Sequence, residues 1–273
     1  MSQEESRPWG ATTARMEQLG RAAAAAVTEF GYLAALLGES LYWLALGRRR
    51  HQPVRVAAVF AEMMETGVRA IPICALLLFT VGLMLAIQGL HTLETFGAQT
   101  KLVPLVALSI TREFAPLIVG ILVAGRSGSA LAARIGTMQV SQEIDALRVI
   151  GVNPVRYLVA PSLVAMLIML PMLTILADGI GILGAAVYGA PRLDIGLAVF
   201  GQQTLDALTA GDVLQGIGKS AIFAMLIALI ACSTGFSVSG GAEGVGRAAT
   251  RAVVVSISSV VVADMVFTFL LSR

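Results

Sequence analysis

The sequence predicts an all-α, polytopic helical membrane protein, with an N-terminal interfacial helix followed by about five transmembrane helices. Of its 273 residues, 57% are hydrophobic and 13% are charged, whereas an average soluble domain is about 25% charged. The apolar residues form long blocks, and roughly 20 apolar residues suffice for a helix to cross a bilayer. The basic residues lie scattered between these blocks, a pattern that argues against nucleic-acid binding.

The N-terminal region, residues 1–54, is predicted to lie at the membrane surface. Its most apolar stretch, Ala22–Leu46, contains Glu29 and Glu39, and each charge near mid-bilayer would cost about 2.5–3.5 kcal/mol. An amphipathic helix in the interface avoids this cost, and a sixth span is the alternative. The expected interfacial anchors are Tyr32, Tyr42 and Trp43, with Arg48, Arg49 and Arg50 facing lipid headgroups.

The rest of the chain, residues 55–273, is predicted to form one membrane domain. Its third apolar block, residues 157–191, is longer than one crossing needs, which implies a tilted helix or an extension beyond the bilayer. The five predicted spans are residues 70–90, 102–125, 157–191, 213–236 and 252–271. The two cysteines, Cys74 and Cys232, and the two histidines, His51 and His91, are isolated, so no disulfide or metal site is expected.

The distribution of basic residues predicts the orientation, because cytoplasmic segments of membrane proteins are enriched in Lys and Arg. A cytoplasmic N-terminus places fourteen of the 19 basic residues inside and leaves two short outer loops. The fourteen are Arg7, Arg15, Arg21, Arg48, Arg49, Arg50, Arg55, Arg69, Arg126, Arg134, Arg148, Arg156, Arg247 and Arg251.

The connection between the second and third spans, residues 126–156, is predicted to contain a short cytoplasmic helix. Ser141 is its expected N-cap, and Gly151 and Pro154 end it. Such a helix suits docking into a groove of a soluble partner, although a solvated loop helix would show the same pattern. Its first turn carries Glu143 and Asp145, its end carries Arg148, and Ile144, Leu147 and Val149 or Ile150 can form an apolar face.

These residues resemble the MlaE/YrbE-type permease family of MCE-associated lipid ABC transporters, from about Arg55 to the C-terminus. One departure is Arg134, at a position where the family usually has an acidic residue. The matching motifs are Arg112-Glu113-Phe114-Ala115-Pro116, Ala124-Gly125-Arg126-Ser127-Gly128-Ser129-Ala130, Gly136-Thr137-Met138, Gln142-Glu143-Ile144-Asp145-Ala146-Leu147, Gly151-Val152-Asn153-Pro154, Tyr157-Leu158, Pro161, and Gly246-Arg247-Ala248-Ala249-Thr250-Arg251-Ala252-Val253 with Asp264 and Thr268.

The resemblance implies an MlaE-like permease fold in a bacterial inner (plasma) membrane, spanning it several times with a cytoplasmic N-terminus. It implies a permease subunit that moves phospholipid or a related lipid between the inner membrane and the periplasm or outer membrane. The implied partners are a second copy of the chain, two copies of an ABC ATPase subunit, a periplasmic MCE-domain protein and membrane lipid. The chain itself would bind no cofactor, because the partner subunit would hydrolyse ATP.

Two sets of site residues follow from the resemblance. The lipid-binding set is Leu85, Gln88, Leu93, Phe96, Arg112 and Glu113, and the ATPase-coupling set is Gln142, Glu143, Ile144, Asp145, Leu147 and Arg148. Ionisable residues inside a membrane usually face a partner or a cavity. Arg112 and Glu113 therefore line a lipid cavity or, alternatively, lock helices together with Asp178, Lys219 or Asp264. For these last three residues the helix lock is the expected role.

Two other functions compete with lipid transport by a permease. An ion-coupled secondary transporter could use Glu113, Asp178 and Asp264 as a proton relay, but it would usually contain an internal repeat, which the sequence lacks. An intramembrane enzyme lacks a Ser/His, His-Glu-x-x-His or paired-carboxylate arrangement.

Two short glycine motifs are predicted to be structural. The glycines of residues 179–184 match a dinucleotide-binding pattern, but they lie within a long apolar helix, where close helix packing explains them better. Gly218-Lys219-Ser220 echoes a phosphate loop, but the required earlier glycine is replaced by Val213. The chain is therefore not expected to be an enzyme, and a separate ATPase subunit is required.

Overall fold

The computed structural model describes residues 9–47 and 53–271, and these residues are almost entirely helical, with no β-strand among them. The α-helices are α1 (Trp9–Leu46), α2 (Val56–Thr66), α3 (Ile71–Thr95), α4 (Leu102–Ser109), α5 (Ala115–Val123), α6 (Ser129–Val140), α7 (Glu143–Val149), α8 (Ala160–Arg192), α9 (Leu197–Ala207), α10 (Ala210–Phe236) and α11 (Gly241–Leu271). Short 3₁₀ turns, η1 (Val68–Ala70) and η2 (Gln99–Lys101), precede α3 and α4.

Five stretches of the described residues are long and apolar enough to cross a membrane, which confirms the predicted number of spans. They are Val56–Thr95, Gln99–Val140, Val155–Arg192, Ala210–Phe236 and Gly241–Leu270. The second and fifth helices extend well beyond the predicted 102–125 and 252–271. Hydropathy marks only the apolar part of a helix, whereas these two helices continue through polar turns that carry Arg134 and Arg247.

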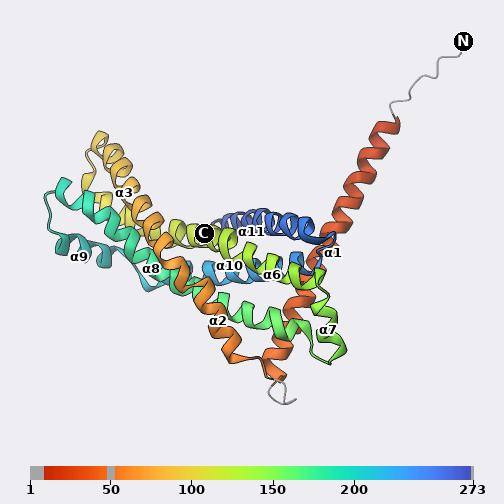
Figure 1. Cartoon of the computed structure of the whole chain (residues 1–273). Helices are drawn as coiled ribbons and strands as arrows, with labels where there is room; N and C mark the ends of the chain where they lie inside the picture. Colours follow the sequence, from red (N-terminus) through yellow and green to blue (C-terminus); the bar gives the residue numbers. More distant parts are fainter. Residues whose placement is uncertain (1–8, 48–52, 272–273) are drawn as a thin grey trace, which may run out of the picture.

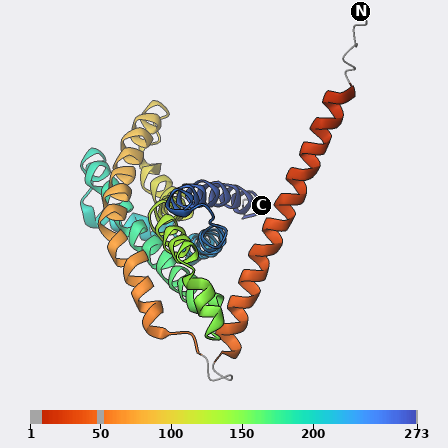
Figure 2. The same ribbon diagram turned by 45° about the vertical axis from the view of Figure 1, so that its right-hand side comes forward.

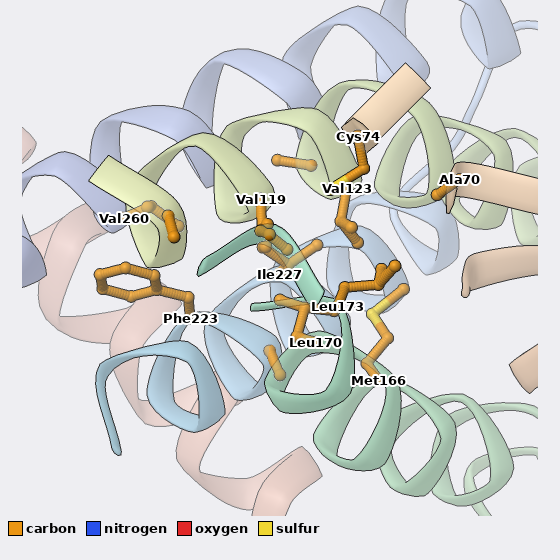
Figure 3. Close-up of a cluster of buried hydrophobic side chains, with 14 of the residues drawn as sticks. Ala70, Cys74, Val119, Val123, Met166, Leu170, Leu173, Phe223, Ile227 and Val260 are labelled. Atoms are coloured by element: carbon orange, nitrogen blue, oxygen red, sulfur yellow. The ribbon is translucent and has the colours of Figure 1, made fainter. Parts of the chain in front are cut away.

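Helix α8 forms the centre of the bundle, packing along α3 on one side and α10 on another. Helix α10 also packs on α6 and α11. The buried side chains that join these helices are apolar, and Figure 3 shows Cys74, Val119, Met166, Leu170, Phe223 and Ile227 meeting from α3, α5, α8 and α10. Large apolar side chains also cover outward faces, such as Leu76, Met172 and Val262. An apolar outer surface over membrane-length helices suits a lipid environment.

Two glycines of residues 179–184, Gly181 and Gly184, allow α8 to approach α3 backbone to backbone. A Cβ atom added at Gly184 would lie 2.2 Å from the carbonyl oxygen of Phe79, and one at Gly82 would lie 1.9 Å from the carbonyl oxygen of Gly181. Side chains larger than hydrogen cannot fit at such distances, so the pattern is a helix-packing motif.

Three π-helical turns interrupt the second and third spans: η3 (Ile110–Phe114), η4 (Ala124–Gly128) and η5 (Val155–Val159). Pro116 and Pro161 follow η3 and η5, and proline cannot donate the backbone hydrogen bond of a regular α-helix. Turn η4 contains Gly and Ser residues, which also favour such irregularities. π-turns occur frequently at functional sites, and η3 carries both Arg112 and Glu113.

The loops of the bundle gather at two opposite ends (Figure 1). One end, which we call the α9 end, contains α9, the C-terminal part of α3 and the start of α4. The opposite end, which we call the α7 end, contains α7 and the start of α8. Helix α1 passes this second end and its N-terminal half stands clear of the other helices, as Figure 2 also shows. Of the predicted anchors, Arg48, Arg49 and Arg50 lie outside the described residues.

Candidate functional site

Arg112 of η3 is paired with Asp212 at the start of α10. Its Nε donates a hydrogen bond to Oδ1 of Asp212 over 2.6 Å, and its Nη2 contacts the same carboxylate. The Asp212 side chain is 4% exposed, while that of Arg112 is 45% exposed. The pair therefore has one buried, fixed member and one member that stays accessible.

Asp212 is fixed because it also caps α10. The backbone N–H and the hydroxyl of Thr209 donate to its Oδ2 over 2.7 and 2.8 Å. In return, the N–H of Asp212 donates to the Thr209 hydroxyl, which completes a capping box. Asp212 is absent from the predicted site residues, although Thr209, followed three residues later by an acidic residue before an apolar run, is a usable signal for a capping box.

Glu113 belongs to a separate buried network centred on Lys219, whose side chain is fully buried. Nζ of Lys219 donates to Oε2 of Glu113 over 2.5 Å and to the Thr268 hydroxyl over 2.9 Å. It also lies 3.0 Å from Oδ1 of Asp264. The Thr268 hydroxyl donates in turn to the Glu113 carboxylate. One ammonium group thus joins η3, α10 and α11.

The structure therefore places Glu113, Lys219 and Asp264 in the contacts of the helix-lock alternative. Asp178 does not join them: its buried Oδ1 has no hydrogen-bond partner among the described residues. The expected helix-lock pairing of Asp178 is thus not found in this structure. The described residues also contain no group of three His, Cys, Asp or Glu side chains that could hold a metal ion.

An apolar pocket opens between α3 and α4 at the α9 end, with a volume of about 310 Å³. Gly89 lines it, and a Cβ atom there would lie only 3.2 Å from the Leu102 side chain, so glycine lets α3 approach α4 closely at this point. The pocket brings together Leu85, Gln88 and Leu93 of the predicted lipid-binding set, whereas Phe96 lies outside its lining and is 79% exposed. The complete lining is Leu85, Gln88, Gly89, Thr92, Leu93, Leu105, Val106 and Ser109.

Helix α7 is held against the bundle by one side chain and exposes most of the others. Ile144 is fully buried, whereas Val149 and Ile150 are 87% and 71% exposed. The remaining predicted coupling residues are also accessible: Gln142, Glu143, Asp145 and Arg148 are exposed, and Leu147 is half-buried. Ile144 therefore positions the helix from beneath, and the predicted set omitted the two most exposed apolar residues.

The predicted N-cap of α7 is wrong. Ser141 ends α6, and its hydroxyl donates to the carbonyl of Thr137 over 2.6 Å. Gln142 precedes α7 in a left-handed conformation, with φ of 60°, and makes no side-chain cap. The previous helix continues up to this corner, so the Ser141 hydroxyl is used by that helix.

Arg134 forms an ion pair with Glu62, which lies 72 residues earlier in the chain. Its Nη2 donates to Oε2 of Glu62 over 2.8 Å and joins α6 to α2. The basic residue at this position therefore has an acidic partner within the same chain.

These features define a class: a helical membrane permease, with membrane-length helices, an apolar pocket at one end and an exposed short helix at the other. The family model described as permease MlaE matches residues 59–270. The chain belongs to the MlaE family of ABC transporter permeases.

Its relatives come from distant lineages. The chain is 34% identical to the intermembrane phospholipid transport system permease protein MlaE of Haemophilus influenzae, covering 80% of this chain and 83% of that protein. It is 34% identical to a "Probable ABC transporter permease protein" of Rickettsia typhi, over 81% of this chain and 85% of the relative. It is also 36% identical to the chloroplastic protein TRIGALACTOSYLDIACYLGLYCEROL 1 of Arabidopsis thaliana, over 75% of this chain and 59% of that protein.

Proposed function

We propose that this chain is the permease subunit of an ABC transporter that moves phospholipid or a related lipid between the inner membrane and the periplasm or outer membrane. The apolar pocket between α3 and α4 is the observation that carries the proposal. The name of the Haemophilus influenzae relative, which refers to intermembrane phospholipid transport, supports the lipid class.

The pocket suits part of a lipid rather than a whole one. Its volume of about 310 Å³ lies at the low end of small-molecule sites. Most of its lining surface is apolar, with Leu85, Leu93, Leu105 and Val106 as the hydrophobic side chains, so an acyl chain is the part that would be held there. Phe96 stands exposed beyond this pocket. A second copy of the chain would close the pocket and complete a lipid site between the two permeases.

Arg112 is the proposed contact for the anionic headgroup. Asp212 occupies Nε and Nη2, and an arginine has five N–H donors, so donors remain for a phosphate. Glu113 would act indirectly, since its carboxylate is engaged by Lys219. In this proposal Glu113 keeps η3, and with it Arg112, in position.

The α7 end is the proposed docking site for two copies of a separate ABC ATPase subunit, which would hydrolyse the ATP. Val149 and Ile150 project from α7 beside its exposed charged residues, and exposed apolar side chains rimmed by charge are typical of a protein interface. The N-terminus would then be cytoplasmic, and a periplasmic MCE-domain protein would bind the α9 end.

Lipid transfer by reconstituted complexes tests the pocket. We expect Leu85→Trp, which fills the pocket, to lower ATP-dependent phospholipid transfer between vesicles at least about tenfold, the scale of a lost buried apolar contact. The control is Met84→Trp, at the neighbouring residue, which is 45% exposed and does not line the pocket. This variant should transfer lipid at the wild-type rate. Equal loss of transfer in both variants would reject the pocket as the lipid site. Transfer driven by a proton gradient without ATP would reject the ABC transporter in favour of an ion-coupled carrier.

Copurification of the ATPase tests the docking site. The double variant Val149→Asp, Ile150→Asp should lose most of the bound ATPase, because charge replaces the two most exposed apolar residues of this corner. Leu197→Asp alters a 61% exposed apolar residue of α9, at the opposite end, and serves as the control. Full ATPase binding by the double variant would place the coupling surface elsewhere.

A further inference from the structure

Helix α1 is attached to the turn that follows α7, 114 residues later in the sequence. The side-chain N–H of Asn153 donates to Oε1 of Glu39 over 2.7 Å. Four residues further along α1, the ring of Trp43 lies under the guanidinium of Arg156, at 5.5 Å from its centroid. Leu36 and Ser40, on the same side of α1, are buried. Helix α1 is thus packed and bonded at this point.

Asn153 joins three elements because its side chain both accepts and donates. Its Oδ1 accepts hydrogen bonds from the N–H groups of Val155 and Arg156, over 2.8 and 3.2 Å, and so caps the start of the third span. Its amide nitrogen is left to bond Glu39. A carboxylate at this position would keep the cap and lose the donor.

The short turn between α7 and Asn153 is itself fixed by backbone hydrogen bonds. Val152 donates to the carbonyl of Leu147 over 2.8 Å, and Gly151, with φ of 79°, donates to that of Arg148 over 3.0 Å. These bonds couple α7 directly to Asn153, so we expect a displacement of α7 to be passed on through this turn. It should then move the start of the third span and, through Asn153, helix α1.

A second contact ties α1 to the start of the fifth span. Glu29 accepts a hydrogen bond from Arg251 of α11 over 3.4 Å. Ten residues of helix separate Glu29 from Glu39, which corresponds to about 15 Å. A helix of this length is stiff enough to carry a displacement from one contact to the other.

We propose that α1 is a strap that passes the movement of α7 to α11. Glu39 is the positioning residue, because its hydrogen bond with Asn153 links α1 to the turn that follows α7. The inference rests on the proposed function, in that an ATPase moves α7. One ATP-driven displacement would then act on the third and fifth spans together. The two glutamates that make α1 unsuited to cross the bilayer are both used in contacts with these spans, Glu39 with Asn153 and Glu29 with Arg251.

Exchange of the two hydrogen-bonding partners tests the strap. Glu39→Ala removes the acceptor, and Asn153→Asp keeps the cap but sets two carboxylates against each other. Each should lower the lipid transferred per ATP hydrolysed at least about tenfold, the scale of one lost hydrogen bond to a charged group, with complex assembly and thermal stability retained. The double variant Glu39→Gln, Asn153→Asp restores the bond in reverse and should recover the ratio. Failure of this rescue would overturn the proposal.

A distance measurement separates the strap from the identity of the cargo. Spin labels are attached to cysteines introduced by Leu41→Cys in α1 and Thr95→Cys in α3, and the distance between them reports the movement of α1. Both positions are exposed and accept a label, whereas the native Cys74 and Cys232 are buried. Labelled chain is diluted with unlabelled chain, so that pairs within one chain dominate. ATP should shift the distance by about 1–2 Å or more in the wild type and not in Glu39→Ala.

The two proposals then fail differently. An unchanged distance in the wild-type complex with ATP would reject the strap. A changed distance without lipid transfer would leave the strap standing and reject the lipid as cargo.

Discussion

Two carboxylates share one ammonium group inside the membrane domain. Lys219 is fully buried, and Glu113 and Asp264 are 33% and 15% exposed at the side chain. Removing one member of a buried ionic cluster leaves its partners without compensation, which typically costs more than the whole cluster contributes.

The variant Lys219→Met should therefore lower the free energy of unfolding by about 3 kcal/mol, measured by thermal or denaturant unfolding in detergent. The cost arises from two carboxylates left without a counter-ion. The triple variant Glu113→Gln, Lys219→Met, Asp264→Asn removes all three charges and should recover most of this stability. If the single and triple variants are equally unstable, the charges are not what holds η3, α10 and α11 together.

Arg134 and Glu62 make a simpler, reversible pair. Arg134→Glu places two carboxylates together and should destabilise the chain by about 1 kcal/mol, a modest value because the Arg134 side chain is 47% exposed. The swapped variant Glu62→Arg, Arg134→Glu should restore the midpoint of thermal unfolding. An additive loss in the double variant would show that the two side chains do not interact.

At this scale the sequence predicts which residues need a partner but seldom which partner they have. The intramembrane charges were identified from their cost in lipid, and a helix lock was an expected alternative. The partner of Arg112, however, lies 100 residues away, and no spacing rule connects Arg112 with Asp212. Ser141 shows the opposite limit, since its capping pattern was plausible locally but the preceding helix uses its hydroxyl.

Helix α8 meets α3 through glycines whose roles differ within one short motif. Gly184 lies against the backbone of Phe79, whereas a Cβ atom at Gly179 would have no neighbour within 4 Å. The sequence pattern predicts close packing for the motif as a whole. The pattern does not specify which glycine faces α3, because that depends on the rotation of α8 about its axis.

Gly184→Ala should therefore destabilise the domain by about 2–3 kcal/mol through overpacking, measured as loss of folded protein in a detergent thermal ramp. Gly179→Ala makes the same chemical change in the same helix and should be neutral or slightly stabilising, because alanine is the better helix former. Similar effects of the two substitutions would mean that α8 is rotated differently against α3.

The ends of helices were less predictable than the helices themselves. Each predicted span lies largely within an observed helix, but the second continues to Val140, so the predicted connection 126–156 is mostly the end of that helix and then α7. Membrane helices tolerate proline where neighbouring groups satisfy the freed backbone carbonyls. The π-turns beside Pro116 and Pro161 show the local adjustment, and η3 sets the directions of Arg112 and Glu113.

Across the whole molecule, the basic residues mark one end. Arg55, Arg134, Arg156 and Arg251 all make contacts there, with Tyr157, Glu62, Trp43 and Glu29 respectively. Lys101 and Arg192 lie towards the opposite end, in η2 and at the end of α8. The fold thus keeps the asymmetry from which a cytoplasmic α7 end is predicted.

Cysteine accessibility tests this orientation directly. A membrane-impermeant thiol reagent added to spheroplasts should label Thr95→Cys, at the α9 end, and leave Ser141→Cys unlabelled until the membrane is opened. Both positions are exposed, and the native Cys74 and Cys232 are buried and should react little. The reverse pattern would place α7 outside the cell. A cytoplasmic ATPase could then not reach Val149 and Ile150, and the proposed docking site and the strap would both fail with the orientation.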